Sequence, residues 1–154
     1  MIRKLIAAAV ISFAALAGMG FAYLGAQSAP QQDKADIPAF HATLPTPPLP
    51  ATLDPKVFSD VLNQNVYALA AKEKAVLYQQ PCYCHCDREV GHKSLLDCYV
   101  DRHASVCSVC KMEAVYAYQQ TKLGKAPAQI REAIIQGKWK DVDLSKFNLA
   151  PAAK

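Results

Sequence analysis

Residues 81–86 read Pro-Cys-Tyr-Cys-His-Cys (PCYCHC), which places cysteines at alternate positions and a histidine between the last two. In an extended segment alternate side chains point the same way, so Cys82, Cys84 and Cys86 share one side of the chain. This stretch and the six residues after it are too rich in cysteine and turn-forming residues for a regular element. All six cysteines of the 154-residue chain lie between Cys82 and Cys110. We therefore expect an irregular Cys-rich loop around which the neighbouring elements are arranged.

Helical patterns flank this loop on both sides. Upstream, Asp54 followed by Pro55 is a helix start, and apolar residues then recur at three- and four-residue spacing as far as Leu69. Downstream, Gly124 provides a C-terminal cap for one helix and Pro127 opens another. The expected helices are residues 54–70, 74–78, 94–100, 105–123 and 127–136. Because no strand pattern of useful length occurs, we predict an all-α fold, a small Cys-rich domain of three to five helices.

The chain begins with a targeting segment. Arg3 and Lys4 precede an uncharged, apolar run over residues 5–26, which is about the length that a helix needs to span a bilayer. Residues 1–29 are therefore interpreted as either a cleaved signal peptide or a retained N-terminal membrane anchor. Both alternatives export the remainder, since the positive charge stays on the cytoplasmic side. We expect the protein in the periplasm or on the extracytoplasmic face of the inner membrane, anchored or secreted.

Proline marks the connection between this segment and the helical domain. Residues 30–53 contain the run TLPTPPLPATL, which cannot continue a helix or form a central strand. We interpret residues 30–53 as an extended linker that acts as a spacer, in which His41 is a solvated histidine. The Cys-rich helical domain then spans residues 54–140, and residues 141–154 are expected to form an irregular tail.

The charge and motif content exclude several classes of function. The formal net charge is +4, and removing Arg3 and Lys4 with the leader leaves about +2, too little to indicate a nucleic-acid partner. The sequence contains no glycine-rich phosphate loop, no Ser-His-Asp order with a nucleophile elbow, and no carboxylate pair in an apolar pattern. These observations favour a binding or structural protein over an enzyme.

The cysteines and histidines form a candidate metal site. His103, Cys107 and Cys110 stand at i, i+4 and i+7 and project from one face if the helix reaches back to His103. The cysteine loop needs only to fold over that face to complete four ligands, and C-x-C pairs suit copper(I) or a zinc-thiolate cluster. The predicted ligands are Cys82, Cys84, Cys86, Cys107, Cys110, His103 and His92. Cys98 is not assigned to the ligands; it is expected to be either a buried thiol or a disulfide partner.

Two alternatives to metal binding remain open at this stage. Exported thiols tend to oxidise, so the six cysteines are also consistent with three disulfides that staple an interaction module, in any of 15 connectivities. The Cys107-x-x-Cys110 pair is also compatible with a thiol-disulfide oxidoreductase. Covalent haem is excluded, because Lys111 stands where C-x-x-C-H requires histidine. Clustered histidines favour the metal, used for sequestration, delivery or structural stabilisation.

The order of these motifs resembles a known family. PCYCHC, then GHKSLLDCYV and HASVCSVC, is similar to the bacterial PCYCGC-motif proteins over residues 72–137. These are small exported or membrane-tethered proteins, many of them lipoproteins, with a domain of unknown function. The resemblance implies an exported Cys-rich module. The apolar residues 5–26 predict a membrane contact, and we further expect a membrane or periplasmic protein partner. His85 departs from the family's glycine, and no lipobox cysteine is present.

Overall fold

The structure is a computed structural model that describes residues 36–44 and 47–148. Its α-helices are α1 (Val61–Lys72), α2 (Lys74–Leu77), α3 (Cys86–Glu89), α4 (His103–Val106), α5 (Ser108–Lys122) and α6 (Pro127–Ile135). Four 3-10 helices accompany them: η2 (Pro55–Val57), η3 (Leu95–Tyr99), η4 (Lys138–Asp141) and η5 (Leu144–Asn148). The described residues contain no strand, which confirms the all-α prediction for them. They hold six α-helices instead of three to five, because three are single turns of four residues.

The first helical segment differs from the sequence prediction of one helix starting at Asp54. Asp54 caps only η2, where its side chain accepts a hydrogen bond from the Lys56 amide at 2.9 Å. The chain is then extended at Phe58, whose ring packs 4.3 Å from that of Tyr67. A second cap, Asp60, starts α1 by accepting the Asn63 amide at 2.8 Å. Two aspartate caps in succession therefore divide the apolar stripe into two elements.

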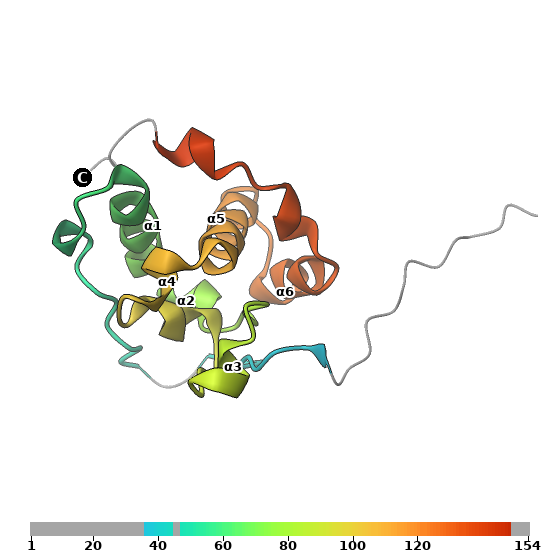
Figure 1. The fold of residues 1–154 in the computed structure, drawn as a ribbon. Helices are drawn as coiled ribbons and strands as arrows, with labels where there is room; N and C mark the ends of the chain where they lie inside the picture. Colours follow the sequence, from blue (N-terminus) through green and yellow to red (C-terminus); the bar gives the residue numbers. More distant parts are fainter. Residues whose placement is uncertain (1–35, 45–46, 149–154) are drawn as a thin grey trace, which may run out of the picture. The chain divides into compact units, whose positions relative to one another are not determined.

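An apolar core occupies the space between the three longest helices. Helix α5 lies between α1 and α6 (Figure 1) and packs against both. Their inward faces supply side chains that are almost fully buried, together with the tryptophan of η4. The members of this core are Val66, Leu69, Ala114, Ala117, Ile130, Ile134 and Trp139. The helices at residues 74–78 and 127–136 are confirmed as α2 and α6, within one or two residues at their ends.

The segment after residue 140, expected to be irregular, is partly helical. Helix η5 packs on α1, where the Asn65 side-chain amide donates to the Phe147 carbonyl at 2.6 Å. Trp139 in η4 is 6% exposed. The helical domain therefore extends at least to Asn148, because these residues cover the outer side of α1 and α5.

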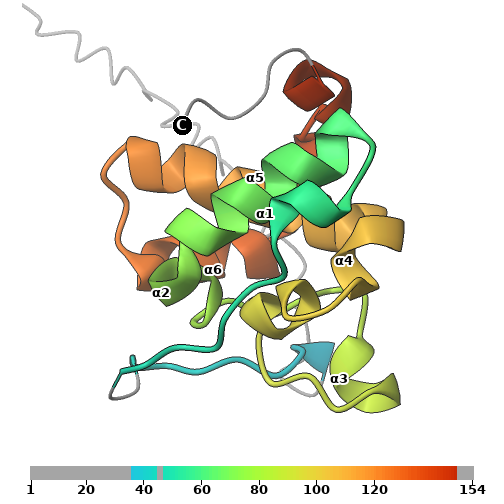
Figure 2. The same cartoon turned by 90° about the vertical axis from the view of Figure 1, so that its left-hand side faces the viewer.

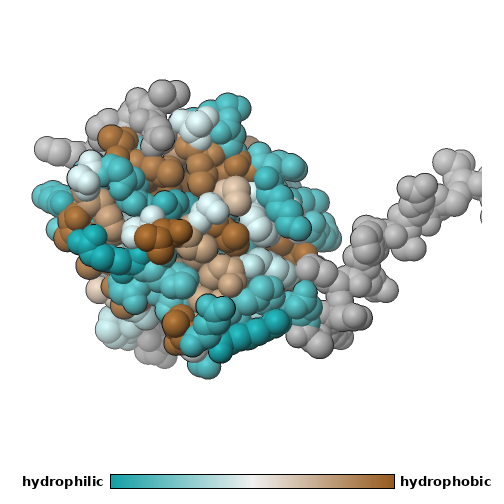
Figure 3. Space-filling model, in the orientation of Figure 1, coloured by the Kyte–Doolittle hydropathy of each residue, from teal (hydrophilic) through white to brown (hydrophobic). Residues whose placement is uncertain are grey.

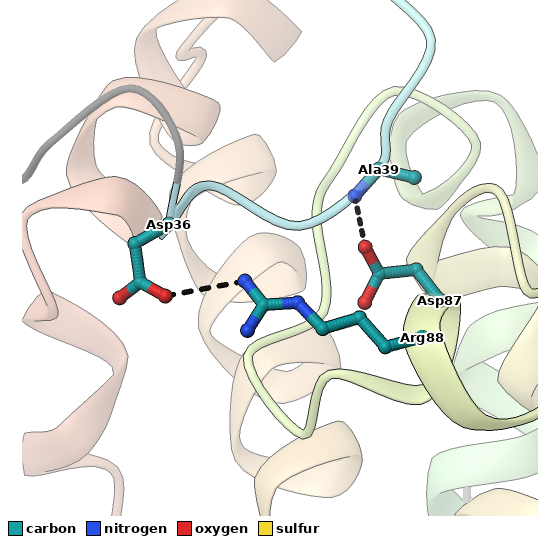
Figure 4. A network of polar contacts seen from close by, with 4 residues as sticks. All are labelled: Asp36, Ala39, Asp87 and Arg88. Carbon is teal, nitrogen blue, oxygen red and sulfur yellow. Dashed lines mark hydrogen bonds and ion pairs between the residues drawn. The ribbon is translucent and has the colours of Figure 1, made fainter.

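The described part of the proline-rich segment lies on the helical domain and is not free of it. Figure 4 shows two of its contacts with α3: the Ala39 amide donates to Asp87 Oδ2 at 3.1 Å, and Asp36 pairs with Arg88 at 3.2 Å. His41, expected to be solvated, stacks on Tyr78 with ring centroids 3.9 Å apart. In Figure 2 the chain from residue 36 runs beneath the domain beside α3. Residues 36–44 therefore do not form a detached spacer.

The surface is mixed in character. On the face shown in Figure 3, apolar side chains form several groups that are interrupted by hydrophilic ones. Within the described ranges, no helix combines the length and the apolar character needed to cross a bilayer. The hydrophobic segment predicted at residues 5–26 lies outside those ranges.

Candidate metal centre

The cysteine loop is shaped by a left-handed turn. The His85 amide donates to the Cys82 carbonyl at 3.1 Å, and His85 itself adopts φ 59°, a conformation in which glycine is the residue of lowest cost. This turn makes Cys86 the first residue of α3, a helix that the sequence did not predict. The Leu95 amide donates to the Gln80 carbonyl at 2.9 Å, so η3 starts beside the beginning of the loop. The loop is thereby folded back on η3 and α5.

Three sulfur atoms meet where the loop contacts α5. The Sγ atom of Cys82 lies 3.3 Å from that of Cys84 and 3.5 Å from that of Cys110, and the Cys84–Cys110 distance is 3.6 Å. We call Cys82, Cys84 and Cys110 the first triad. Its three edges are nearly equal, so one ion above the triangle can contact all three atoms.

A second group of three donors forms between α3, η3 and the turn before it. Cys86 and Cys98 have Sγ atoms 3.4 Å apart, and His92 Nδ1 lies 3.2 Å from Cys86 Sγ and 3.4 Å from Cys98 Sγ. We call Cys86, Cys98 and His92 the second triad. It again places three possible ligand atoms at mutual van der Waals distance.

The two triads are adjacent, and His103 lies between them. His103 Nε2 is 3.7 Å from Cys84 Sγ, and its ring meets that of His92 edge-on with centroids 5.0 Å apart. Three sets of four donors each have all ligand atoms within 4.8 Å of one another. The sets are Cys82, Cys84, Cys86, Cys98; Cys84, Cys98, His103, Cys110; and Cys86, His92, Cys98, His103. Groups of this kind are able to hold a metal ion, and Cys98 belongs to every set.

The helix predicted to carry His103, Cys107 and Cys110 on one face is not continuous. Helix α4 ends at Val106, Cys107 is extended (φ −109°, ψ 111°), and α5 starts at Ser108. Cys107 caps α5 by accepting the Cys110 amide at 3.5 Å, so its thiol replaces the serine or aspartate usual at this position. The prediction of a shared helical face is wrong. His103 and Cys110 nevertheless meet at Cys84, through the break between two helices.

The cluster has a buried side and a side that reaches solvent. Four cysteines are buried, each with an exposed fraction of 3% or less: Cys82, Cys86, Cys98 and Cys110. Cys84, Cys107, His92 and His103 are half-buried. An ion held by the cluster therefore lies below the surface, but several of its ligands can be approached from outside.

Hydrogen bonds among the thiols divide them into those that hold a proton and those that release one. Hydrogen bonds with Cys107, Cys110 and Cys82 lower the pKa of Cys84. Hydrogen bonds with Cys110 and Cys82 likewise lower the pKa of Cys98 to about 4. The pKa of Cys82 is raised, first by its hydrogen bond with Cys110. The pKa of Cys110 is raised in turn, first by its hydrogen bond with Cys107. The cluster therefore favours thiolate, the form that binds metals, at Cys84 and Cys98.

Histidine 103 responds to the same negative charge. Desolvation lowers its pKa, but the hydrogen bond with Cys84 and the charges of Cys98 and Cys84 outweigh that effect and the pKa is raised. A bound cation competes with the proton for this ring nitrogen, because a histidine that coordinates a metal must be neutral.

A buried carboxyl group supports the first triad from behind. Glu113, one helical turn after Cys110, is 0% exposed, and its Oε1 accepts the Tyr83 amide at 2.9 Å. Its Oε2 has no hydrogen-bond partner among the described residues, and burial raises the pKa of the Glu113 carboxyl well above its usual value. Tyr99 adds a second support by donating its hydroxyl to the Cys110 carbonyl at 2.9 Å.

The comparison with protein families rests on these same residues. A family model described as a protein of unknown function with a PCYCGC motif matches residues 26–144, most of the chain. The chain belongs to this family. The PCYCGC motif corresponds to residues 81–86, where His85 occupies the position of the motif's glycine. Because that position has a positive φ, the fold itself explains why the motif contains glycine there. Searches of curated proteins and of solved structures return no significant match.

Most of the predicted ligands come together, and one central residue was not predicted. Six of them are members of the donor sets: Cys82, Cys84, Cys86, Cys110, His92 and His103. Cys107 belongs to none of these sets and contacts the cluster through the Cys110 amide. Cys98 was missed as a ligand, although it follows buried Leu95 by three residues, the repeat of a 3-10 helix. That spacing was the available signal that Cys98 points inward.

Proposed function

We propose that this PCYCGC-family protein is an exported module that binds a transition metal, zinc or copper(I), for sequestration or delivery. The observation that carries the proposal is the gathering of five cysteine sulfurs and two histidine nitrogens in overlapping sets with ligand atoms within 4.8 Å. Such a set of soft sulfur and borderline nitrogen donors selects thiophilic ions over magnesium or calcium. The family has no described function that argues for another role.

The spacing of the sulfurs supports this chemistry. Four sulfur ligands at a zinc–sulfur distance of about 2.3 Å form a tetrahedron with an edge of roughly 3.8 Å. The first triad has edges of 3.3–3.6 Å. Small outward shifts of the side chains therefore bring these atoms to coordinating positions.

Exchange of the ion is favoured over a purely structural role. Structural zinc sites are closed, with four protein ligands sealed from solvent. Here Cys84 and His103, both half-buried, adjoin the surface, and Cys107 lies next to them at the start of α5. An incoming ligand, such as a thiol of a partner protein, can reach Cys84 before any buried cysteine.

The two alternatives receive less support. All six thiols are free, and touching sulfurs in the first triad lie 3.3–3.6 Å apart, whereas a disulfide bond is about 2.05 Å long. Disulfides also give no reason for His92 and His103 to join the cluster. An oxidoreductase requires a low thiol pKa at Cys107, but the pKa of Cys107 is raised: the Cys110 hydrogen bond lowers it, and the Cys84 hydrogen bond and burial outweigh this.

Export and membrane attachment belong to the proposal as well. The uncharged run at residues 5–26, behind Arg3 and Lys4, supports an inner-membrane anchor or a signal peptide. The metal site then faces the periplasm, where the partner is a membrane or periplasmic metal-binding protein.

The test is elemental analysis combined with thiol counting on the full chain. The protein is purified without oxygen, and reactive thiols are counted before and after a chelator removes the metal. We expect zinc or copper in the purified protein and several additional reactive thiols after chelation. The matched control pair is His103→Ala, which loses bound metal, and His41→Ala, which retains it because His41 lies on Tyr78 outside the cluster. Absence of both metal and reactive thiols contradicts the proposal and supports the disulfide-stapled alternative.

A further inference from the structure

The number of donors exceeds what one ion uses. A tetrahedral ion takes four protein ligands, and a trigonal copper(I) ion takes three. The donor sets together contain seven different residues. Either three or four donors remain unused beside one ion, or the cluster holds more than one ion.

The shortest distances between donor atoms form two adjacent triangles, whose members Cys82, Cys84, Cys86 and Cys98 lie within 4.8 Å of one another. In the first triad the three sulfur–sulfur distances are 3.3, 3.5 and 3.6 Å. In the second triad the sulfur–sulfur distance is 3.4 Å, and His92 Nδ1 lies 3.2 and 3.4 Å from the two sulfur atoms. Each triangle by itself offers one ion three ligands.

The two triangles are also built from different parts of the chain. The first joins the cysteine loop to α5, through Cys110. The second joins α3 to η3 and to His92, which follows the glycine turn at Gly91. The two triads therefore draw most of their donors from different elements, and they meet where Cys98 of η3 hydrogen-bonds with Cys110 of α5.

We propose that the cluster is a two-ion centre, with one thiophilic ion on Cys82, Cys84 and Cys110 and a second ion on Cys86, Cys98 and His92. This inference rests on the proposed function, since it assigns the number of ions to the same site. His103 lies in donor sets with members of both triads and supplies a fourth ligand between them. Cys98 belongs to every donor set, which makes its thiolate the bridge between the ions.

Charge favours the second ion. Five cysteines contribute to the two triads, and four of them, Cys82, Cys86, Cys98 and Cys110, are buried. One divalent ion balances the charge of two thiolates, so the remaining buried thiols stay protonated beside it, because unpaired negative charge is costly to bury. A second cation displaces those protons and lets both triads bind as thiolates.

The experiment is a metal titration of the full chain in detergent, followed by native mass spectrometry. The reduced protein is titrated separately with Zn²⁺ and with Cu⁺, both buffered by competing ligands. We expect two ions per chain with at least one of these metals. Any stoichiometry other than two with both metals overturns the two-ion centre. A stoichiometry of zero with both also overturns the proposed function, whereas one ion overturns only the inference drawn here.

Single substitutions assign the ions to the triads. Cys82→Ser in the first triad and His92→Ala in the second are each expected to lower the stoichiometry from two to one. His85→Ala is the matched control, since His85 belongs to no donor set, and it is expected to retain two. Loss of both ions, or of neither, in Cys82→Ser and His92→Ala overturns the assignment. Circular dichroism in the helical region checks that each variant is folded. If a variant is unfolded, the number of ions bound by the wild type alone decides whether the centre holds two ions.

Discussion

The interior of this domain has two regions that are built in different ways. The apolar core lies between α1, α5 and α6, which are nine residues long or longer and meet through aliphatic side chains such as Val66 and Ile134. The donor cluster lies among a loop, η3 and two single-turn helices, α3 and α4. Single turns are not stable in isolation, because the free energy that one turn gains does not offset the cost of helix nucleation. The core holds its helices by burial, whereas the cluster needs its donors to be tied together.

Helix α5 connects the two regions. Its N-terminal turn carries Cys110, and its later turns place Ala114 and Ala117 in the apolar core. Glu113 sits at the junction, buried but facing the cluster through Tyr83. The comparison therefore teaches that an ion held by the cluster would act on the first turn of α5 and the apolar core acts on its later turns, so separate perturbations distinguish them.

Metal removal is expected to have the largest effect. At a free ion concentration 1,000 times the Kd, the bound ion adds about 4 kcal/mol to the free energy of unfolding. Chelation should therefore lower the stability by that amount and increase amide hydrogen exchange mainly within residues 82–110. Protection in α1 and α6 should persist at low denaturant. Denaturant unfolding and hydrogen-exchange mass spectrometry measure both quantities, and equal loss of protection throughout the domain would contradict the division into two regions.

Truncation in the apolar core comes next. Ile134→Ala removes a side chain that is 0% exposed, and such truncations cost about 3 kcal/mol. Because Ile134 belongs to no donor set, the loss should be the same with and without metal, and the bound metal per chain should not change. Ile135→Ala, at a half-buried position of the same helix, is the matched control and should cost less. A change in metal content in Ile134→Ala would show that the two regions are not independent.

The buried carboxyl gives a pH dependence of intermediate size. Burial raises the pKa of Glu113 in the folded protein, whereas the unfolded value is about 4.3. The carboxyl is thus compatible with folding at low pH, and its contribution is lost as the pH rises towards the folded pKa. Glu113→Gln should therefore stabilise the metal-free protein progressively as the pH rises from about 4.3 towards the folded pKa, by up to about 1.4 kcal/mol per pH unit.

The measurement is the free energy of unfolding as a function of pH for the wild type and Glu113→Gln. Glu132→Gln, at an exposed position of α6, is the control and should follow the wild type at every pH. A Glu113→Gln curve parallel to the wild type would mean that the pKa of Glu113 is the same in the folded and unfolded protein and would contradict the raised pKa.

The smallest expected effect concerns the turn of the cysteine loop. His85 has φ 59°, and its Nδ1 is buried without a hydrogen-bond partner among the described residues. Replacing it with the family's glycine should stabilise the protein by about 1 kcal/mol. Gly91→Ala, at φ 77° in open space, is the reverse test and should destabilise it by about 1 kcal/mol. Thermal unfolding measures both, and a destabilised His85→Gly would contradict the strain.

The sequence predicted well those helices whose end signals are local. The helices at residues 74–78 and 127–136 follow from apolar spacing and from proline and glycine at their ends, and both are present. The break at Cys107 was not predictable, since a cysteine acting as a helix cap has no strong local signature. The packing of residues 36–44 on α3 depends on contacts across 48 positions of sequence, as between Ala39 and Asp87.

The sequence predicted most of the residues of the site but not how they are arranged in space. Spacing identified the loop cysteines, Cys110 and the two histidines as donors, and the structure gathers them. It assigned no place to Cys98, because the role of that residue follows from the burial of η3 against the loop. The division into two triads depends on tertiary folding and is not visible in any spacing of the chain.

X-ray absorption spectroscopy of the metal bound to the purified full chain tests the central claim most directly. The account predicts a first shell dominated by sulfur, with a metal–sulfur distance of about 2.3 Å for zinc and a minor contribution from histidine nitrogen. The same spectrum should lose sulfur neighbours in Cys98→Ser. A first shell of oxygen and nitrogen alone would contradict the claim that these cysteines form a metal centre.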